Sequence, residues 1–129
     1  MKNILLDTHT VLYWINKYEK LSDLAKITLE DEEIILYLSL ASFWEIAIKT
    51  SNGKLSELHG GITEFLYRIQ HIPVSVIPIN LSYIKALEKL PKIHKDPFDR
   101  IIITTAQTEN MPILTSDQKI HEYQVETIW

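Results

Sequence analysis

Several features are missing from this sequence of 129 residues, and each absence narrows what the chain can be. It contains no cysteine, which excludes disulfide bonds, thiolate metal sites and cysteine nucleophiles, and which fits a reducing compartment. The first apolar run, Ile4 to Leu6, is broken by Asp7, and no run approaches the roughly 20 apolar residues of a membrane span. Because there is neither a signal peptide nor an anchor, we expect a cytoplasmic protein without a membrane partner.

An excess of basic residues is also missing. Thirteen lysines and arginines face 17 aspartates and glutamates, and the formal net charge is −4. This balance argues against a protein that holds nucleic acid mainly through a broad positive field, so a polyanionic substrate would need local help. Repeats, low-complexity segments and linkers are absent as well. The length and the 46% hydrophobic content therefore predict one globular domain over residues 1–129.

Short apolar runs alternate with amphipathic segments along the chain. This alternation predicts an α/β fold with a mainly parallel central sheet of four to five strands and helices on both faces. The expected strands are 3–6, 34–38, 74–79, 113–115 and, at an edge, 125–128. The expected helices are 8–15, 22–29, 39–49, 62–69 and 81–90, with a further helix from Pro97 to the exit at Asn110 and a short one starting at 116–117.

The segment from His94 to Arg100, His-Lys-Asp-Pro-Phe-Asp-Arg, is the densest charged cluster in the chain. Asp96 followed by Pro97 predicts a helix start, with Asp96 as the N-cap and Asp99 at the third helical position. The apolar residues that follow recur at three- and four-residue spacing and predict a buried helix face. Two carboxylates are therefore held at the head of a rigid helix.

Acidic residues fall at two kinds of position that meet in a parallel sheet. Asp7 and Asp117 lie just past the carboxyl ends of expected strands, whereas Glu45, Asp96 and Asp99 lie near the amino ends of expected helices. Both kinds of position share the edge of the sheet at which ligands bind. Unpaired carboxylates packed together there would repel one another by several kcal/mol unless cations lay between them. Oxygen ligands favour Mg²⁺ or Mn²⁺ over zinc.

Each acid also has a purely structural interpretation as a helix cap. Residues 42–45, Ser-Phe-Trp-Glu, match a capping box, and Asp96 matches a simple N-cap. Asp7 and Asp117 could likewise cap a helix or favour its dipole. Capping nevertheless gives no reason for a carboxylate, rather than serine or threonine, at every corner of one sheet edge.

The basic and aromatic residues near the acids have two interpretations each. His94, Lys95 and Arg100 are candidates to contact phosphates beside the acids, although a solvated rim explains Lys95 better. We expect Lys49, four residues after Glu45, to be its helical ion-pair partner. Trp14 and Trp44 are expected in the core rather than in base stacking.

Four segments together resemble one known family. They are Ile4-Leu5-Leu6-Asp7-Thr8-His9-Thr10, Ser42-Phe43-Trp44-Glu45-Ile46-Ala47-Ile48-Lys49, His94 to Arg100, and Leu114-Thr115-Ser116-Asp117. In this order and at these separations the chain resembles a PIN-domain ribonuclease, a VapC-type toxin of a type II toxin–antitoxin system, from Asn3 to about Tyr123. The resemblance implies that Asp7, Glu45, Asp99 and Asp117 are the catalytic metal-binding acids, that Asp96 is an additional acid, and that the Thr115 and Thr8 hydroxyls support them.

The resemblance also implies Mg²⁺-dependent cleavage of RNA, with Mn²⁺ as a possible substitute, a homodimer, and a small antitoxin partner. Two rivals are weighed against this function. A phosphatase with an aspartyl nucleophile would want a second aspartate where this chain has His9. A non-catalytic binding module of the same fold would keep the acids mainly as helix caps and would bind no metal.

A site for the antitoxin is suggested by the first helix. Residues 11–15, Val-Leu-Tyr-Trp-Ile, place apolar side chains nearly all round that helix, which is more than one buried face requires. Leu21 and Leu24 begin the next helix nearby. We therefore expect an amphipathic partner helix to dock between the first two helices.

Overall fold

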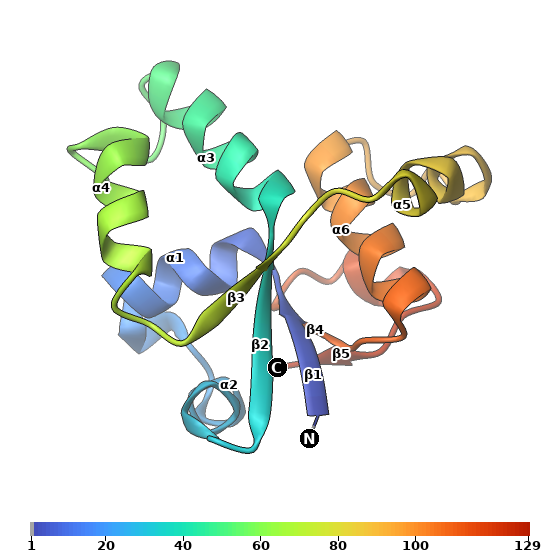
Figure 1. Ribbon diagram of the computed structural model, residues 1–129, viewed down its shortest axis with the longest axis horizontal. Helices are drawn as coiled ribbons and strands as arrows, with labels where there is room; N and C mark the ends of the chain where they lie inside the picture. Colours follow the sequence, from blue (N-terminus) through green and yellow to red (C-terminus); the bar gives the residue numbers. More distant parts are fainter. Residues whose placement is uncertain (1) are drawn as a thin grey trace.

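The computed structural model describes residues 2–129 and contains one sheet of five parallel strands (Figure 1). The strand order is β3-β2-β1-β4-β5, and every neighbouring pair is parallel. The strands are β1 (Lys2–Leu6), β2 (Ile34–Ser39), β3 (Val74–Ile77), β4 (Ile113–Leu114) and β5 (Thr127–Ile128). Parallel pairing places the carboxyl ends of β1, β2 and β4 at the same edge of the sheet.

Helices cover the sheet from both sides. In Figure 1, α1, α2 and α4 lie on one side of the strands, and α5 and α6 lie on the other. The helices are α1 (Thr8–Asn16), α2 (Asp23–Glu30), α3 (Leu40–Ser51), α4 (Gly61–Ile69), α5 (Leu81–Ala86) and α6 (Pro97–Glu109). Short 3₁₀ turns follow at Tyr18–Lys20, Leu87–Lys89 and Ile120–Glu122.

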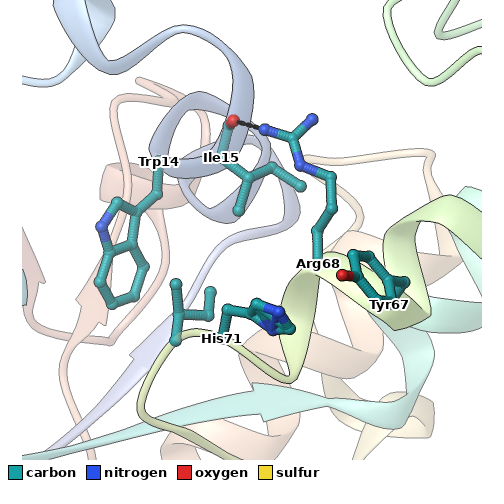
Figure 2. A pocket seen from close by; sticks show the side chains of 6 residues that line it. Trp14, Ile15, Tyr67, Arg68 and His71 are labelled. Atoms are coloured by element: carbon teal, nitrogen blue, oxygen red, sulfur yellow. Dashed lines mark hydrogen bonds between the residues drawn. The ribbon is translucent and has the colours of Figure 1, made fainter.

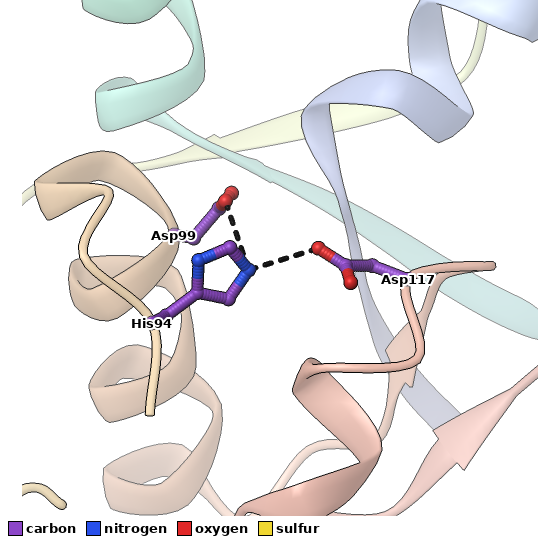
Figure 3. A group of neighbouring side chains, drawn as sticks. All are labelled: His94, Asp99 and Asp117. Atoms are coloured by element: carbon purple, nitrogen blue, oxygen red, sulfur yellow. Dashed lines mark hydrogen bonds and ion pairs between the residues drawn. The ribbon is translucent and has the colours of Figure 1, made fainter. Parts of the chain in front are cut away.

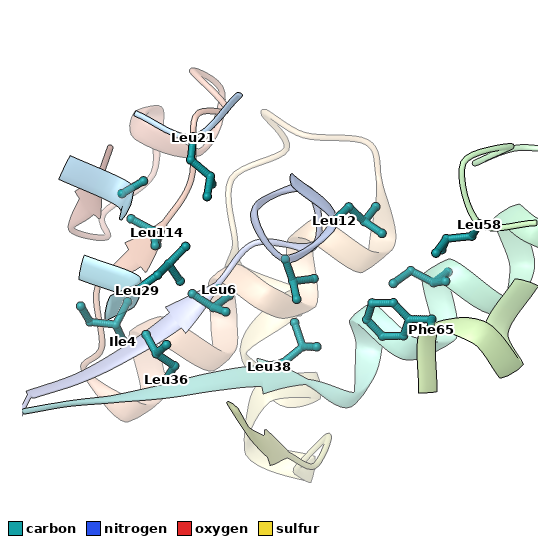
Figure 4. Close-up of a cluster of buried hydrophobic side chains, with 13 residues drawn as sticks. Ile4, Leu6, Leu12, Leu21, Leu29, Leu36, Leu38, Leu58, Phe65 and Leu114 are labelled. Carbon is teal, nitrogen blue, oxygen red and sulfur yellow. The ribbon is translucent and has the colours of Figure 1, made fainter. Parts of the chain in front are cut away.

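Two hydrophobic clusters sandwich the central strand. Ile4 and Leu6 of β1 point into one cluster, which also contains Phe65 of α4 (Figure 4). Leu5 points to the opposite face and packs with α6 residues such as Ile102. A central strand buried on both faces is the expected pattern for a parallel sheet. The two clusters hold α1 and α6 rigidly against the strands whose ends carry the acids.

The fold class expected from the sequence is confirmed, but several boundaries differ. The helix expected over 81–90 ends at Ala86 and continues only as a 3₁₀ turn. No α-helix begins at 116–117 in the described chain. Asp117 Oδ1 accepts a hydrogen bond from Lys119 N, but only a 3₁₀ turn follows, at Ile120–Glu122. Within residues 2–129, no helix combines the length and the apolar character needed to cross a membrane.

Candidate metal centre

Four separate elements bring carboxylates to the carboxyl edge of the sheet. Asp7 directly follows β1, and Asp117 lies three residues after β4. Glu45 lies in the second turn of α3, and Asp99 lies in the first turn of α6. Each of Glu45, Asp99 and Asp117 is near enough to Asp7 for electrostatic repulsion to act between the charges. The four acids implied by the family resemblance are therefore neighbours.

Asp7 is buried, with 2% of its surface exposed. The Thr115 hydroxyl donates a hydrogen bond of 2.7 Å to Asp7 Oδ2, and the same hydroxyl accepts from Asp117 N at 3.0 Å. Asp7 Oδ1 has no hydrogen-bond partner among the described residues. Burial raises the pKa of Asp7, although the Thr115 hydrogen bond opposes this. Asp7 occupies the N-cap position of α1 but makes no side-chain capping bond, so the capping interpretation fails for this residue.

Glu45 is the second deeply buried acid, with 1% of its surface exposed. Lys49 Nζ lies 2.5 Å from Glu45 Oε2, which confirms the expected helical ion pair. Glu45 Oε1 faces no hydrogen-bond partner within residues 2–129. The predicted capping box at 42–45 is wrong, because α3 begins at Leu40 and its N-cap is Ser39. Ser42 instead pairs its hydroxyl with that of Thr8 at 2.8 Å and joins α3 to α1.

The carboxylates of Asp99 and Asp117 both approach Nε2 of the His94 imidazole (Figure 3). His94 Nε2 lies 2.9 Å from Asp117 Oδ2 and 3.4 Å from Asp99 Oδ2. Burial, followed by the charges of Asp7 and other nearby acids, raises the pKa of Asp99 to about 8. Burial acts in the same direction on Asp117, but its hydrogen bonds to His94 and to the Lys119 backbone outweigh it and lower the pKa of Asp117.

Asp96 is a genuine helix cap. Its Oδ1 accepts hydrogen bonds from Phe98 N at 2.8 Å and from Asp99 N at 3.3 Å. Oδ1 therefore acts as the N-cap of α6, and the negative charge of Asp96 also raises the pKa of Asp99.

The basic residues of the same segment differ in what they contact. Arg100 donates to the backbone carbonyls of Pro91, His94, Leu90 and Leu87 at 2.8 to 3.4 Å. These bonds favour a structural role for Arg100 over the phosphate contact expected from the sequence. Lys95 is exposed and lines a shallow depression with Lys92, as a solvated rim would.

The aromatic residue beside Glu45 lies at the surface. Trp44 is 57% exposed, so its expected place in the core is wrong. Its ring packs edge to face against Phe98 of α6, with the ring centroids 5.0 Å apart. This pair joins the heads of α3 and α6 directly beside two of the acids.

A family model for the PIN domain matches residues 4–126. The chain belongs to the PIN domain family. No curated protein matches it significantly.

The solved structures show the same fold at low sequence identity. VapBC2 from Rickettsia felis, bound to a promoter DNA fragment, has a TM-score of 0.75 at 17% identity and covers 98% of each chain. A toxin–antitoxin complex from Klebsiella pneumoniae has a TM-score of 0.65 at 20% identity, covering 98% of this chain and 96% of its own. DNA-bound VapBC from Salmonella typhimurium has a TM-score of 0.66 at 12% identity, covering 99% and 98%.

The acids of this PIN domain fit a divalent cation. Two buried carboxylate oxygens, Asp7 Oδ1 and Glu45 Oε1, find no hydrogen-bond donor among residues 2–129. An unpaired buried carboxylate oxygen is costly, and the neighbouring acids add repulsion rather than relief. A hard cation between the acids removes both penalties at once. The donor set of this PIN domain therefore suits a metal such as Mg²⁺ or Mn²⁺.

Sequence reasoning missed two contacts that build the site. It assigned His94 to phosphate binding, whereas the imidazole lies between two acids, and it did not identify Tyr123, whose hydroxyl accepts from His94 N at 2.5 Å. Both contacts depend on the path of the loop over residues 91–96 and on the turn after β4. Sequence spacing carries no signal for such a path.

Proposed function

We propose that this PIN domain is a Mg²⁺-dependent endoribonuclease and the toxin of a VapC-type toxin–antitoxin pair, acting in the cytoplasm. The proposal rests on two buried carboxylate oxygens, Asp7 Oδ1 and Glu45 Oε1, that have no hydrogen-bond partner among residues 2–129. The two acids lie on different elements and repel each other. Such an arrangement destabilises the protein unless a cation is bound. Residues 1–129 would form one nuclease domain.

Each acid of the site has a distinct task in this proposal. Asp7, Asp99 and Asp117 would hold the ion, and Glu45 would add a fourth carboxylate from α3. A bound divalent ion supplies a water acidic enough to attack phosphorus and neutralises charge on the scissile phosphate. The Thr115 hydroxyl fixes Asp7 by its 2.7 Å hydrogen bond, so that Oδ1 stays turned away from the donor and free for a ligand.

The basic side chains near the acids would serve an anionic substrate. Lys49 neutralises one oxygen of Glu45, which limits the negative field that an approaching phosphate meets. Exposed Lys95 and Lys92 form a positive rim beside the site and would contact phosphates farther along the RNA.

Incubation of the purified protein with a mixed RNA pool, with and without EDTA, tests the function. Cleavage that depends on Mg²⁺, with cut ends mapped by sequencing, is the expected result. Asp7→Asn should abolish it without lowering the melting temperature, and Asp23→Asn, the same change at an exposed helix position, serves as the matched control. Cleavage that survives EDTA, or an active Asp7→Asn variant, would contradict the proposal.

The non-catalytic alternative needs the acids to be helix caps. Of the five acids, only Asp96 caps an α-helix through its side chain, while the buried Asp7 and Glu45 do not. The alternative therefore gives no role to Asp7 and Glu45, the two acids whose burial destabilises the protein most. It predicts that calorimetry shows no binding of Mn²⁺ at millimolar concentration.

We also propose an antitoxin partner, because the structural neighbours include complexes of toxins with antitoxins. Of the residues that suggested a groove between α1 and α2, Leu12 and Leu21 are buried in the core, whereas Leu24 is 50% exposed. A groove of about 380 Å³ lies between α1 and the end of α4 (Figure 2) and is a second candidate for the antitoxin. Its apolar wall includes Trp14 and Tyr67, and Arg68 crosses it to donate to the Ile15 carbonyl.

An amphipathic antitoxin helix fits this groove by helix-in-groove contacts. Tyr67 is 64% exposed, so Tyr67→Ser removes apolar surface without disturbing the core. We expect this variant to bind its antitoxin several-fold more weakly in calorimetry while its melting temperature is retained. Unchanged affinity would place the antitoxin elsewhere.

We also propose a homodimer, which a second apolar surface supports. A depression of about 480 Å³ lies between α3, α4 and β3, and its lining includes Leu40, Trp44, Leu66 and Val76, each at least 45% exposed. Exposed apolar surface of this extent favours association. Sedimentation of the wild type and of Val76→Asp should show a dimer and a monomer, respectively.

A further inference from the structure

The imidazole of His94 lies at the distance of a metal ligand from two acids of the centre. One ligand atom from each of His94, Asp99 and Asp117 falls within 4.8 Å of the others. Adjacent ligands of an octahedral ion with bonds of about 2.1 Å are about 3 Å apart. The separations from Nε2, 2.9 Å to Asp117 Oδ2 and 3.4 Å to Asp99 Oδ2, match that spacing (Figure 3).

The fold holds His94 in this place from both sides of its backbone. Its N–H donates to Tyr123 Oη at 2.5 Å, and its carbonyl accepts from Arg100 Nη1 at 3.4 Å. Arg100 Nη1 also donates to the Pro91 carbonyl at 2.8 Å, so one guanidinium anchors both ends of the segment 91–94. Only 12% of the His94 side chain is exposed. The imidazole is therefore positioned by the body of the domain.

We propose that His94 Nε2 is a direct ligand of the metal ion, beside Asp99 and Asp117; this inference rests on the proposed metal-dependent function. An imidazole nitrogen is a better ligand for first-row transition ions than for Mg²⁺, which prefers oxygen and water. His94 therefore makes the centre a mixed nitrogen and oxygen site that favours Mn²⁺ over Mg²⁺. Asp7 Oδ1 and Glu45 Oε1, which have no hydrogen-bond partner among residues 2–129, belong to two further acids at the same edge of the sheet.

A different role for His94 would be that of a counter-charge that the ion displaces. The two roles predict opposite effects of removing the imidazole. A ligand that is removed weakens metal binding, whereas a displaced cation that is removed strengthens it. They also differ in whether nitrogen stays bonded to the ion.

Pulsed electron paramagnetic resonance of the protein loaded with Mn²⁺ tests the proposal without any activity measurement. We expect nitrogen modulation from one directly bound imidazole, which changes when histidine is labelled with ¹⁵N. The modulation should be lost in His94→Gln. It should persist in His59→Gln, which replaces an exposed histidine outside the segments that carry the acids. It should also persist in His9→Gln, which tests the other imidazole near the acids.

Calorimetry supplies the second measurement. His94→Gln should weaken Mn²⁺ binding about tenfold and Mg²⁺ binding much less, with the melting temperature in EDTA measured to show that the variant is folded. Mn²⁺ bound by the wild type without nitrogen modulation would overturn the role of His94 and leave the metal-dependent function standing. Tighter Mn²⁺ binding in His94→Gln would do the same. Failure of the wild type to bind Mn²⁺ at all would overturn both proposals.

Discussion

Asp99→Asn should make the metal-free protein more stable while removing its response to metal. Asparagine has nearly the same shape as aspartate but carries no charge in a cluster where Asp7, Glu45 and Asp117 all disfavour one. A pKa that rises from 3.8 to about 8 corresponds to several kcal/mol, since each pH unit is worth about 1.4 kcal/mol. Rearrangement of neighbouring charges and water reduces this, and we expect a gain of about 1–3 kcal/mol at pH 8.

Thermal melts in EDTA and in Mn²⁺ measure both effects. For a domain of this size, about 1–3 kcal/mol corresponds to a rise of roughly 3–12 °C in the melting temperature. Metal at ten times its dissociation constant should stabilise the wild type by about 1.4 kcal/mol and should not stabilise Asp99→Asn. Asp23→Asn, at an exposed helix start, controls for the amide itself. If Asp99→Asn melts below the wild type in EDTA, or still gains stability from Mn²⁺, the carboxylate cluster is not a metal centre.

Three further changes test the surroundings of the site. Because the pKa of Asp99 is raised in the folded state, its protonated form contributes stability that is complete below pH 3.8 and is lost as the pH rises through about 8. In urea titrations without metal, the free energy of unfolding should fall by up to about 1.4 kcal/mol per pH unit between these two values. The slope should be flatter in Asp99→Asn. Asp96→Asn should keep its cap and stay within about 0.5 kcal/mol of the wild type, whereas Asp96→Ala should lose about 1 kcal/mol; equal losses would refute the capping role. Arg100→Ala leaves the Pro91 and His94 carbonyls without their donor and should cost about 1–3 kcal/mol in urea unfolding, while a stable variant with impaired RNA binding would restore the phosphate contact.

Much of the fold followed from local pattern. Short apolar runs predicted β1, which ends directly before Asp7, and β4, and Asp96 before Pro97 predicted the start of α6, because strand burial and capping are decided by neighbouring residues. The nearness of Asp7, Glu45, Asp99 and Asp117 followed from one topological rule, that parallel strands share an edge.

The remaining errors arose where tertiary contact decides. Ser42 has the sequence of a capping residue, yet its hydroxyl bonds to Thr8, because the chain enters α3 directly from β2 and Ser39 takes the cap. Arg100 has a side chain that commonly binds phosphate, yet the loop before α6 surrounds its guanidinium with backbone carbonyls. Neither outcome is visible until the loops are placed.

The exposed ring of Trp44 gives the protein a built-in optical reporter. It touches Phe98 across the heads of α3 and α6, so any change in the separation of these helices alters the surroundings of its indole. Trp14 lies in the groove between α1 and α4, and Trp129 packs against Tyr13 with ring centroids 6.4 Å apart. Variants that keep a single tryptophan would therefore report on two regions separately by intrinsic fluorescence. Trp44 would follow the heads of α3 and α6 together with the proposed dimer surface, and Trp14 would follow a docked helix.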